Sequence, residues 1–184
     1  MSSRRWILAA ALAMTSAGAP ADEYRIDPDH TYPSFEFSHM GLSVWRGKFN
    51  KTSGTVTLDR AAKTGSVEIR IDAASVDFGN RNMNGVALSE EWLDVDRFPL
   101  MRYRGPIEFD GDTPVAVDGQ LTLLAVTRPL KLRINRFKCM THPLFRREVC
   151  GADAEGDLNR AEFGMRQYPE GEKLHLRIQV EAMK

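Results

Sequence analysis

The sequence predicts an all-β protein in which about eight antiparallel strands form a barrel or a sandwich. Three observations support this prediction. Large apolar residues recur at every second position over short stretches, which is typical of half-buried strands. Turn residues separate these stretches at hairpin spacing, and helical periodicity is scarce. Closure into a barrel is attractive because only closure removes both exposed sheet edges.

The alternation runs through most of the chain. The predicted strand segments are 35–37, 55–58, 67–71, 107–109, 121–123, 130–134 and 174–180. The last segment is the clearest, since Leu174, Leu176, Ile178 and Val180 point to one face and charged or polar residues to the other. Turn signals are predicted at 63–65, 110–112, 118–119 and 170–172.

Helical structure is predicted at two short places. Ser89 can cap a turn or two that ends near Leu93, and the segment 41–45 can form another turn. The sequence therefore predicts one or two short helices beside the strands.

Composition points to one globular domain. The 184 residues hold 25 Lys and Arg against 25 Asp and Glu, with 42% hydrophobic and 27% charged residues. This composition excludes a disordered chain. The balanced charge argues against nucleic acid as a partner, because such proteins normally present a strongly basic face.

The first twenty-one residues have the pattern of a signal peptide. Arg4 and Arg5 precede an apolar run over 6–14, and 19–21 reads Ala-Pro-Ala, the form that signal peptidase cleaves. We expect cleavage before Asp22, export, and a mature domain over 22–184. The apolar run is too short to cross a membrane, and no later stretch qualifies as a transmembrane segment.

Export also bears on the two cysteines. In an oxidising compartment, Cys139 and Cys150 are expected to form a disulfide. The alternative is a metal site that uses both sulfurs and His142. Zinc in structural sites usually takes four ligands, and no fourth is evident, so we expect no metal.

Sequence motifs of catalysis are scarce. The chain lacks the serine hydrolase elbow, the Walker loop, the H-E-x-x-H zinc motif and the dinucleotide fingerprint, so we expect no enzyme and no cofactor. His39 follows Phe35 and Phe37 at the next alternate position. It is therefore either a buried histidine with a backbone partner or a polar anchor inside a cavity.

The ordered set of short motifs resembles the YceI-like family. The matching stretches are 24–27, 29–31, 35–41, 47–49, 75–77, 98–99, 117–123, 126–130 and 163–165. The resemblance implies a lipocalin-like eight-stranded antiparallel barrel in the bacterial periplasm, with an internal cavity that binds polyisoprenoids, isoprenoid quinones or similar long-chain amphiphiles. Carried over by position, the cavity wall would comprise Phe37, His39, Trp45, Phe49, Trp92, Phe98, Leu121, Leu123, Phe163 and Met165.

One segment and one single residue depart from the family pattern. Many members carry a charged cluster, Arg-Asp-x-His-Leu, where this chain has Met83-Asn84-Gly85-Val86-Ala87, so a less polar ligand is favoured here. Ala125 stands where glycine is usual.

The leading hypothesis is therefore a periplasmic lipid carrier, acting as a monomer or a homodimer and making transient contact with a membrane or with a lipid donor or acceptor. One alternative is a structural or stress-protective barrel without ligand. The other is a lipid-modifying enzyme that uses His39, His142 and nearby carboxylates.

Overall fold

The strands of the chain close into a barrel. The computed structural model describes residues 21–167 and 172–184. Within these ranges all strands belong to one antiparallel sheet. Its main ring runs in the order β1 (Asp22–Ile26), β4 (Thr52–Asp59), β5 (Thr64–Asp72), β7 (Leu100–Asp110), β8 (Thr113–Leu123), β9 (Val126–Thr141), β10 (Glu148–Asn159) and β11 (Lys173–Met183), after which β11 pairs with β1 again.

At three of the eight positions around the barrel, the strand is divided into two consecutive segments. β2 (Tyr32–His39) continues the line of β1 along β11, β3 (Ser43–Phe49) precedes β4 on the next line, and β6 (Val76–Asp77) follows β5. The described strands thus occupy eight positions, and the predicted eight-stranded antiparallel barrel is confirmed.

The interruption between β1 and β2 is bridged by a side chain. Thr31 Oγ1 donates to the carbonyl of Glu181 and accepts from its N–H, at 3.2 Å and 3.1 Å. The Glu181 carbonyl also accepts the N–H of Asp27 at 2.9 Å, so the threonine hydroxyl chiefly satisfies the Glu181 N–H, which the break would otherwise leave without a partner.

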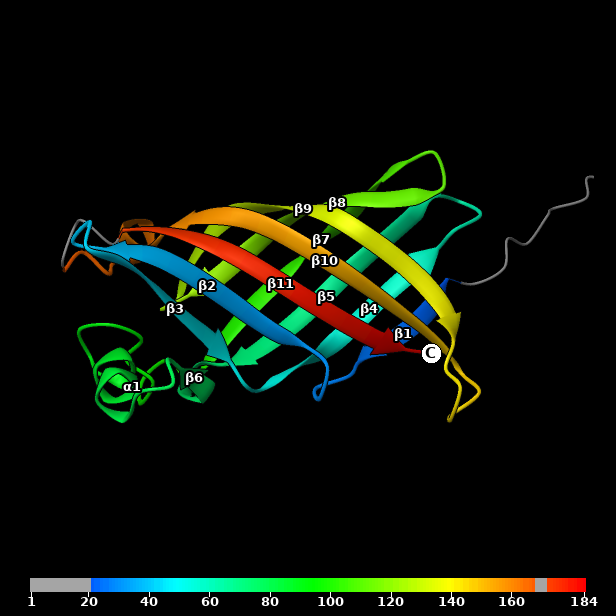
Figure 1. Cartoon of the computed structure of the whole chain (residues 1–184). Coiled ribbons are helices and arrows are strands. Elements are labelled where there is room, and N and C mark those ends of the chain that lie inside the picture. The colour runs from blue at the N-terminus through cyan, green and yellow to red at the C-terminus, as the bar shows by residue number, and fades with distance from the viewer. Residues whose placement is uncertain (1–20, 168–171) are drawn as a thin grey trace, which may run out of the picture.

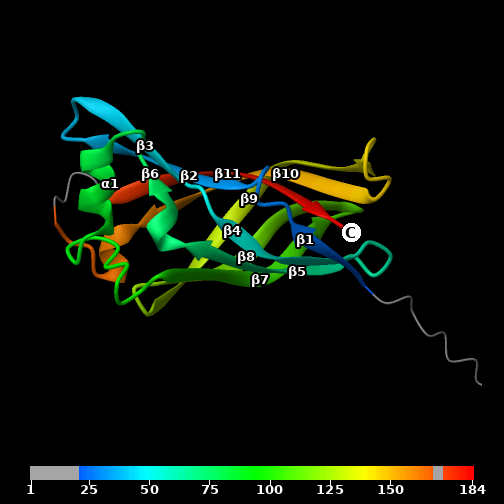
Figure 2. The same ribbon diagram turned by 90° about the horizontal axis from the view of Figure 1, so that it is seen from below.

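The two ends of the barrel carry different structures (Figures 1 and 2). One end holds helix α1 (Arg81–Leu88) and the hairpin between β2 and β3. The other end holds the loop 142–147 between β9 and β10 and lies near the C-terminus. None of the described helices is long and apolar enough to span a bilayer.

Neither predicted segment forms a helix, although each contains a turn: the carbonyl of Ser89 accepts the N–H of Trp92, and the carbonyl of His39 accepts the N–H of Leu42, both at 3.0 Å. The helix lies earlier, over Arg81–Leu88, where Asn80 Oδ1 accepts the N–H groups of Asn82 and Met83. Ser89 ends this helix instead of starting one, since its hydroxyl donates to the carbonyl of Val86. The segment 41–45 is a turn followed by the start of β3, where cross-strand pairing dominates over local helical preference. Two short 3-10 turns, Ala73–Ser75 and Arg160–Phe163, complete the helical structure described.

The predicted turn at Asp118 and Gly119 is also wrong, because both residues lie inside β8. Gly119 serves a packing purpose: a Cβ there would lie 2.3 Å from the Tyr103 ring. The chain turns instead at Leu124 and Ala125, which have φ angles of 51° and 60°. The turn at 110–112 is confirmed, and the one predicted at 63–65 ends at Lys63, since β5 starts at Thr64. The predicted turn at 170–172 falls mainly outside the described residues.

The predicted disulfide is present. Cys139 and Cys150 are directly opposite each other on β9 and β10, with their Cα atoms 4.0 Å apart. The bond therefore links the two strands at the base of the 142–147 loop.

Candidate functional site

The barrel encloses an elongated cavity of about 240 Å³. At the α1 end its wall includes Ala87, Trp92 and Met165, and at the opposite end it includes Leu58 and Cys150. The cavity therefore follows the barrel axis between the two ends.

Alternation along the strands makes the wall apolar. On β9 the wall residues are Leu130, Leu132 and Ile134, while Lys131 and Arg133 between them point outward and pair with Glu108 and Glu155. The same alternation on β11 turns Leu174, Leu176, Ile178 and Val180 inward. Because each inward side chain adds hydrocarbon surface, transfer of an apolar ligand from water into the interior is favoured by the hydrophobic effect.

One strand of the barrel turns several small residues inward. β10 turns Cys150, Ala152 and Ala154 toward the cavity, whereas its neighbours turn Leu, Ile and Val inward. Sequence reasoning missed this strand because it searched for large apolar residues at alternate positions. The signal that could have found it is Ala, Ala and Gly at 152, 154 and 156 alternating with Asp, Glu and Asp.

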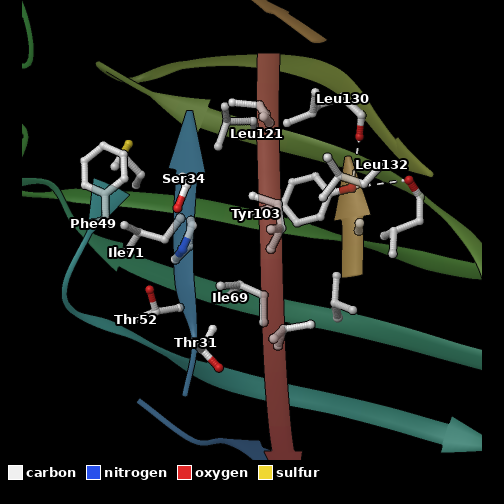
Figure 3. A pocket seen from close by; sticks show the side chains of 18 of the residues that line it. Thr31, Ser34, Phe49, Thr52, Ile69, Ile71, Tyr103, Leu121, Leu130 and Leu132 are labelled. Carbon is white, nitrogen blue, oxygen red and sulfur yellow. Dashed lines mark hydrogen bonds between the residues drawn. The ribbon is translucent and has the colours of Figure 1, made fainter. Parts of the chain in front are cut away.

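Tyr103 places one phenol inside the barrel (Figure 3). Its hydroxyl donates toward the carbonyls of Leu130, at 3.0 Å, and Val117, at 3.3 Å. Burial, with a smaller contribution from the charge of Asp118, raises the pKa of Tyr103 above its ordinary value, so the phenol stays neutral. The hydroxyl is thus satisfied by the protein and leaves the wall effectively apolar.

Two threonines add a polar element near the strand interruptions (Figure 3). Thr31 is satisfied by the backbone of Glu181, as described above. Thr52 is also buried, and among the described residues its Oγ1 has no hydrogen-bond partner. Thr52, Val56 and Leu58 are all even-numbered positions of β4 and point to the same side, so the two-residue alternation in the sequence could have predicted that Thr52 faces inward.

A buried cation closes the α1 end. Arg160 is 1% exposed, and its guanidinium donates to the carbonyls of Met165, at 2.7 Å, and Gln167. The same group lies over the Trp92 ring, 4.7 Å from its centre. Burial lowers the pKa of Arg160, with Glu172 acting in the opposite direction. No sequence signal marks this arginine, since it directly follows a strand and could equally have faced solvent.

A polar triad closes the opposite end. Tyr24 is fully buried, and its hydroxyl donates to Glu148 Oε2 at 2.9 Å. Arg60 binds the other oxygen of Glu148 and also reaches the Tyr24 hydroxyl at 3.3 Å. Sequence reasoning missed this group because its members come from three separate strands or turns.

Four phenylalanines form a cluster toward the α1 end. Phe35 is the centre, with ring centroids 5.4 Å from Phe78 and 5.7 Å from Phe49, and Phe37 lies 6.4 Å from Phe35. The Phe35 ring lies over Gly47, where a Cβ would come within 2.6 Å of it. All four rings line the cavity.

Six of the residues proposed for the cavity wall lie on it: Phe37, Phe49, Trp92, Leu121, Leu123 and Met165. The other four lie elsewhere in the described structure. His39 and Trp45 stack on each other at 3.8 Å near the tip of the β2–β3 hairpin, where the strands extend beyond the enclosed cavity. Phe163 is buried in the core beside the cavity, and Phe98 packs beneath the Arg97 guanidinium.

Helix α1, which contains the segment 83–87 that departs from the family pattern, contributes one residue to the cavity wall. Ala87 is buried and lines the cavity, while Val86 is exposed. Asn84 fixes the helix start, since its amide accepts from the N–H of Phe78 and donates to Asp77. The segment thus presents a small apolar surface to the interior.

The described residues offer little to a metal ion. Cys139, Glu148 and Cys150 lie together, but both sulfurs belong to the disulfide and provide no thiolate ligand. His142 instead accepts the backbone N–H groups of Leu144 and Phe145 through Nδ1.

Comparison with known proteins places the chain among similar barrels. Residues 24–182 match the YceI-like domain. Protein YceI of Salmonella arizonae is 29% identical over 180 residues, covering 95% of this chain and 93% of that protein. The YceI protein of Campylobacter jejuni has a similar fold, with a TM-score of 0.64 at 18% identity over 99% of each chain. A polyisoprenoid binding domain from Saccharophagus degradans, implicated in plant cell wall breakdown, has a TM-score of 0.61 at 15% identity, covering 87% of this chain and 97% of that one.

Proposed function

The chain belongs to the YceI-like domain family, and from that premise we propose that it binds and carries a long-chain amphiphilic lipid, such as an isoprenoid quinone or another polyisoprenoid, inside the barrel. The likeness to a polyisoprenoid binding domain supports this choice of ligand class. We further propose that the protein acts as a binding protein without turnover, in the periplasm, after loss of residues 1–21.

The observation that carries the proposal is the elongated apolar cavity along the barrel axis. Ala152 and Ala154 turn small side chains toward this cavity from β10. Each five-carbon unit moved from water into this interior could contribute up to about 4 kcal/mol, before ordering costs. Affinity would therefore depend mainly on shape and chain length.

The polar groups of the wall favour a neutral ligand. Thr31, Tyr103 and Arg160 are occupied by backbone carbonyls or N–H groups, and the helix that replaces the family's charged cluster presents Ala87. A charged headgroup in the interior would find few free partners. We therefore place any polar headgroup near an end of the cavity.

Native mass spectrometry of protein purified from cell envelopes tests ligand retention. We expect a mass shift that matches a long-chain lipid, which organic extraction then recovers. A single empty species with no extractable lipid would contradict the proposal. N-terminal sequencing of the same sample tests export, with Asp22 expected as the first residue.

Tryptophan fluorescence tests whether the ligand enters the cavity. In the mature chain, Trp92 lies on the wall and Trp45 lies outside it. A short-chain isoprenoid quinone, which quenches indole fluorescence on contact, should saturably quench the W45F variant and quench the W92F variant much less. Stronger quenching of W92F than of W45F would argue against the interior as the site.

Filling the cavity tests the role of β10. Ala154→Leu adds bulk to the wall and should weaken quinone binding by at least tenfold if it blocks two or more buried methylene positions. Ile134→Leu is the matched control, because it preserves volume on the same wall and should bind within about threefold of the parent. Unchanged binding by a folded Ala154→Leu variant would argue against the interior as the site.

A further inference from the structure

The loop between β9 and β10 exposes large apolar side chains at the end opposite α1 (Figures 1 and 2). Leu144 is 81% exposed and Phe145 is 61% exposed, and Met140 at the end of β9 is also exposed. Single exposed apolar residues are ordinary on a protein surface. Three within six residues form a local apolar tip, which is typical of an interaction site.

Hydrogen bonds within the loop define its shape. The N–H of His142 donates to the carbonyl of Arg147 at 2.7 Å, and the N–H of Arg146 donates to the carbonyl of His142 at 2.9 Å. His142 Nδ1 accepts the N–H groups of Leu144 and Phe145, each at 3.2 Å, and its ring stacks on Phe145. The disulfide closes the base of the loop. Because the loop is already ordered, presenting its tip to a partner costs little conformational entropy.

The charged residues within the loop have one sign. Residues 140–147 contain Arg146 and Arg147 and no acidic residue, whereas Arg136 farther back on β9 is paired with Asp153 at 2.6 Å. Arg146 and Arg147 are exposed directly beside the apolar tip. An apolar tip with a basic flank complements an anionic lipid surface, where phosphates meet the arginines and hydrocarbon meets Leu and Phe.

We propose that residues 140–147 form a docking surface for an anionic phospholipid bilayer. Leu144 and Phe145 enter the headgroup region, and Arg146 and Arg147 contact lipid phosphates. Glu148, the next residue, belongs to the triad that closes this end of the barrel, so docking brings that closure to the lipid surface. The docking surface is separate from the cavity and does not depend on what the cavity holds.

The β2–β3 hairpin provides an internal comparison. Its tip also exposes apolar side chains, Met40, Leu42 and Val44, at the α1 end of the barrel. Its adjacent cation Arg46 is paired with Glu36 at 3.0 Å, so it offers less free positive charge. Substitution of this tip is therefore a matched control of equal apolar character.

Vesicle co-sedimentation tests the proposal with the mature protein. The probes are vesicles of phosphatidylglycerol and phosphatidylethanolamine, and vesicles of phosphatidylcholine alone. We expect binding to the anionic vesicles that falls with added salt, and little binding to the neutral ones. The L144S/F145S variant should lose at least tenfold in partitioning, and R146Q/R147Q about 25-fold, at roughly fivefold per cation. The M40S/L42S control should bind within about twofold of the parent.

Several outcomes would overturn the proposal. They are equal binding to neutral and anionic vesicles, unchanged binding of L144S/F145S, and a loss of binding in M40S/L42S as large as in the loop variant. Concentration-dependent self-association that L144S/F145S abolishes, without vesicle binding by the parent, would assign the loop to a second copy of the chain. Quinone quenching measured without vesicles should persist in L144S/F145S, so failure of docking and failure of cavity binding give different results.

Discussion

The two ends of the barrel are closed by different polar groups. At the α1 end the guanidinium of Arg160 is almost fully buried, donates to the carbonyls of Met165 and Gln167 and lies over the Trp92 ring. At the opposite end Arg60 and Glu148 form an ion pair whose side chains remain 44% and 28% exposed, and Tyr24 is buried beneath them. The first closure depends on packing and dehydration, whereas the second depends on groups that water and protons can reach.

The contrast extends to covalent structure. The disulfide lies at the end with the ion pair, where the 142–147 loop projects from the barrel, and the α1 end has no such bond within the described residues. The closure at each end can therefore be weakened by its own substitution, and the resulting losses in free energy of unfolding show how the two ends differ.

Removing the disulfide should have the largest effect on stability. The bond closes a short loop, with a sequence separation of 11, and the chain-entropy model gives about 3 kcal/mol for such a loop. The Cys139→Ser/Cys150→Ser double variant should lose about this much free energy of unfolding in urea. A loss below about 1 kcal/mol would mean that the β9–β10 ladder holds this end without the bond. Reduction of the parent protein by dithiothreitol gives an independent measurement.

Replacing the buried cation should come second. Arg160→Met keeps much of the side-chain volume but leaves the carbonyls of Met165 and Gln167 without their donors. We expect a loss of about 2–3 kcal/mol, because buried unsatisfied groups carry their full desolvation cost. Arg70→Met is the control, since the ion pair of Arg70 with Glu68 is exposed on both sides and should contribute less than about 1 kcal/mol. Equal losses for the two substitutions would show that burial of the guanidinium at the α1 end does not increase its contribution to the free energy of unfolding.

Acid should weaken the ion-paired end selectively. Burial by itself would raise the pKa of Glu148, but hydrogen bonds from Arg60 and Tyr24 outweigh it and the pKa lies below its ordinary value of 4.5. The carboxylate therefore contributes stability above about pH 5, and this contribution is lost as the pH falls through the lowered pKa. Since the pair is partly exposed, we expect Glu148→Gln to cost about 1 kcal/mol at pH 7.

Urea unfolding of Glu148→Gln and of the parent from pH 7 to pH 3 checks this prediction. The difference between them should shrink toward pH 3. A difference for Glu148→Gln that is independent of pH would show that the triad acts through packing alone.

The smallest predicted change is a gain at the α1 end. Leu124 and Ala125 form the turn between β8 and β9 in the left-handed region, with φ of 60° at Ala125. Glycine adopts this region without the strain of a Cβ, so Ala125→Gly should stabilise the protein by up to about 1 kcal/mol. Thermal unfolding should show a rise of a few degrees. A lower Tm would mean that the gain in unfolded-chain entropy outweighs the relief of strain.

Much of the fold could be predicted from local pattern. The alternation at 67–71, 130–134 and 174–180 placed strands correctly, and it also turned the right residues toward the interior, including Leu121, Leu123 and Phe37. This works because side chains of a strand alternate regardless of what lies beside it. The disulfide was likewise predictable from the signal-peptide pattern and the cysteine count.

Other features depended on contacts between distant segments. Asp118 and Gly119 look like a turn, but the Tyr103 ring from β7 occupies the space that glycine leaves, and the strand continues. β10 escaped detection because its inward residues are small, although those residues line the cavity. His39 has the inward parity of Phe35 and Phe37, yet it stacks on Trp45 outside the cavity because the hairpin extends past the enclosed part of the barrel.

The sequence by itself determined which face of each large-residue strand is apolar, since this depends only on the two-residue period of an extended chain. Only the tertiary structure decided how the ends are closed. Arg160 becomes buried, and Tyr24, Glu148 and Arg60 meet, because barrel closure brings together residues that are far apart in sequence. The physical reason is that the alternation of side chains along a strand is a local property of the backbone, whereas closure of a cavity depends on all the strands at once.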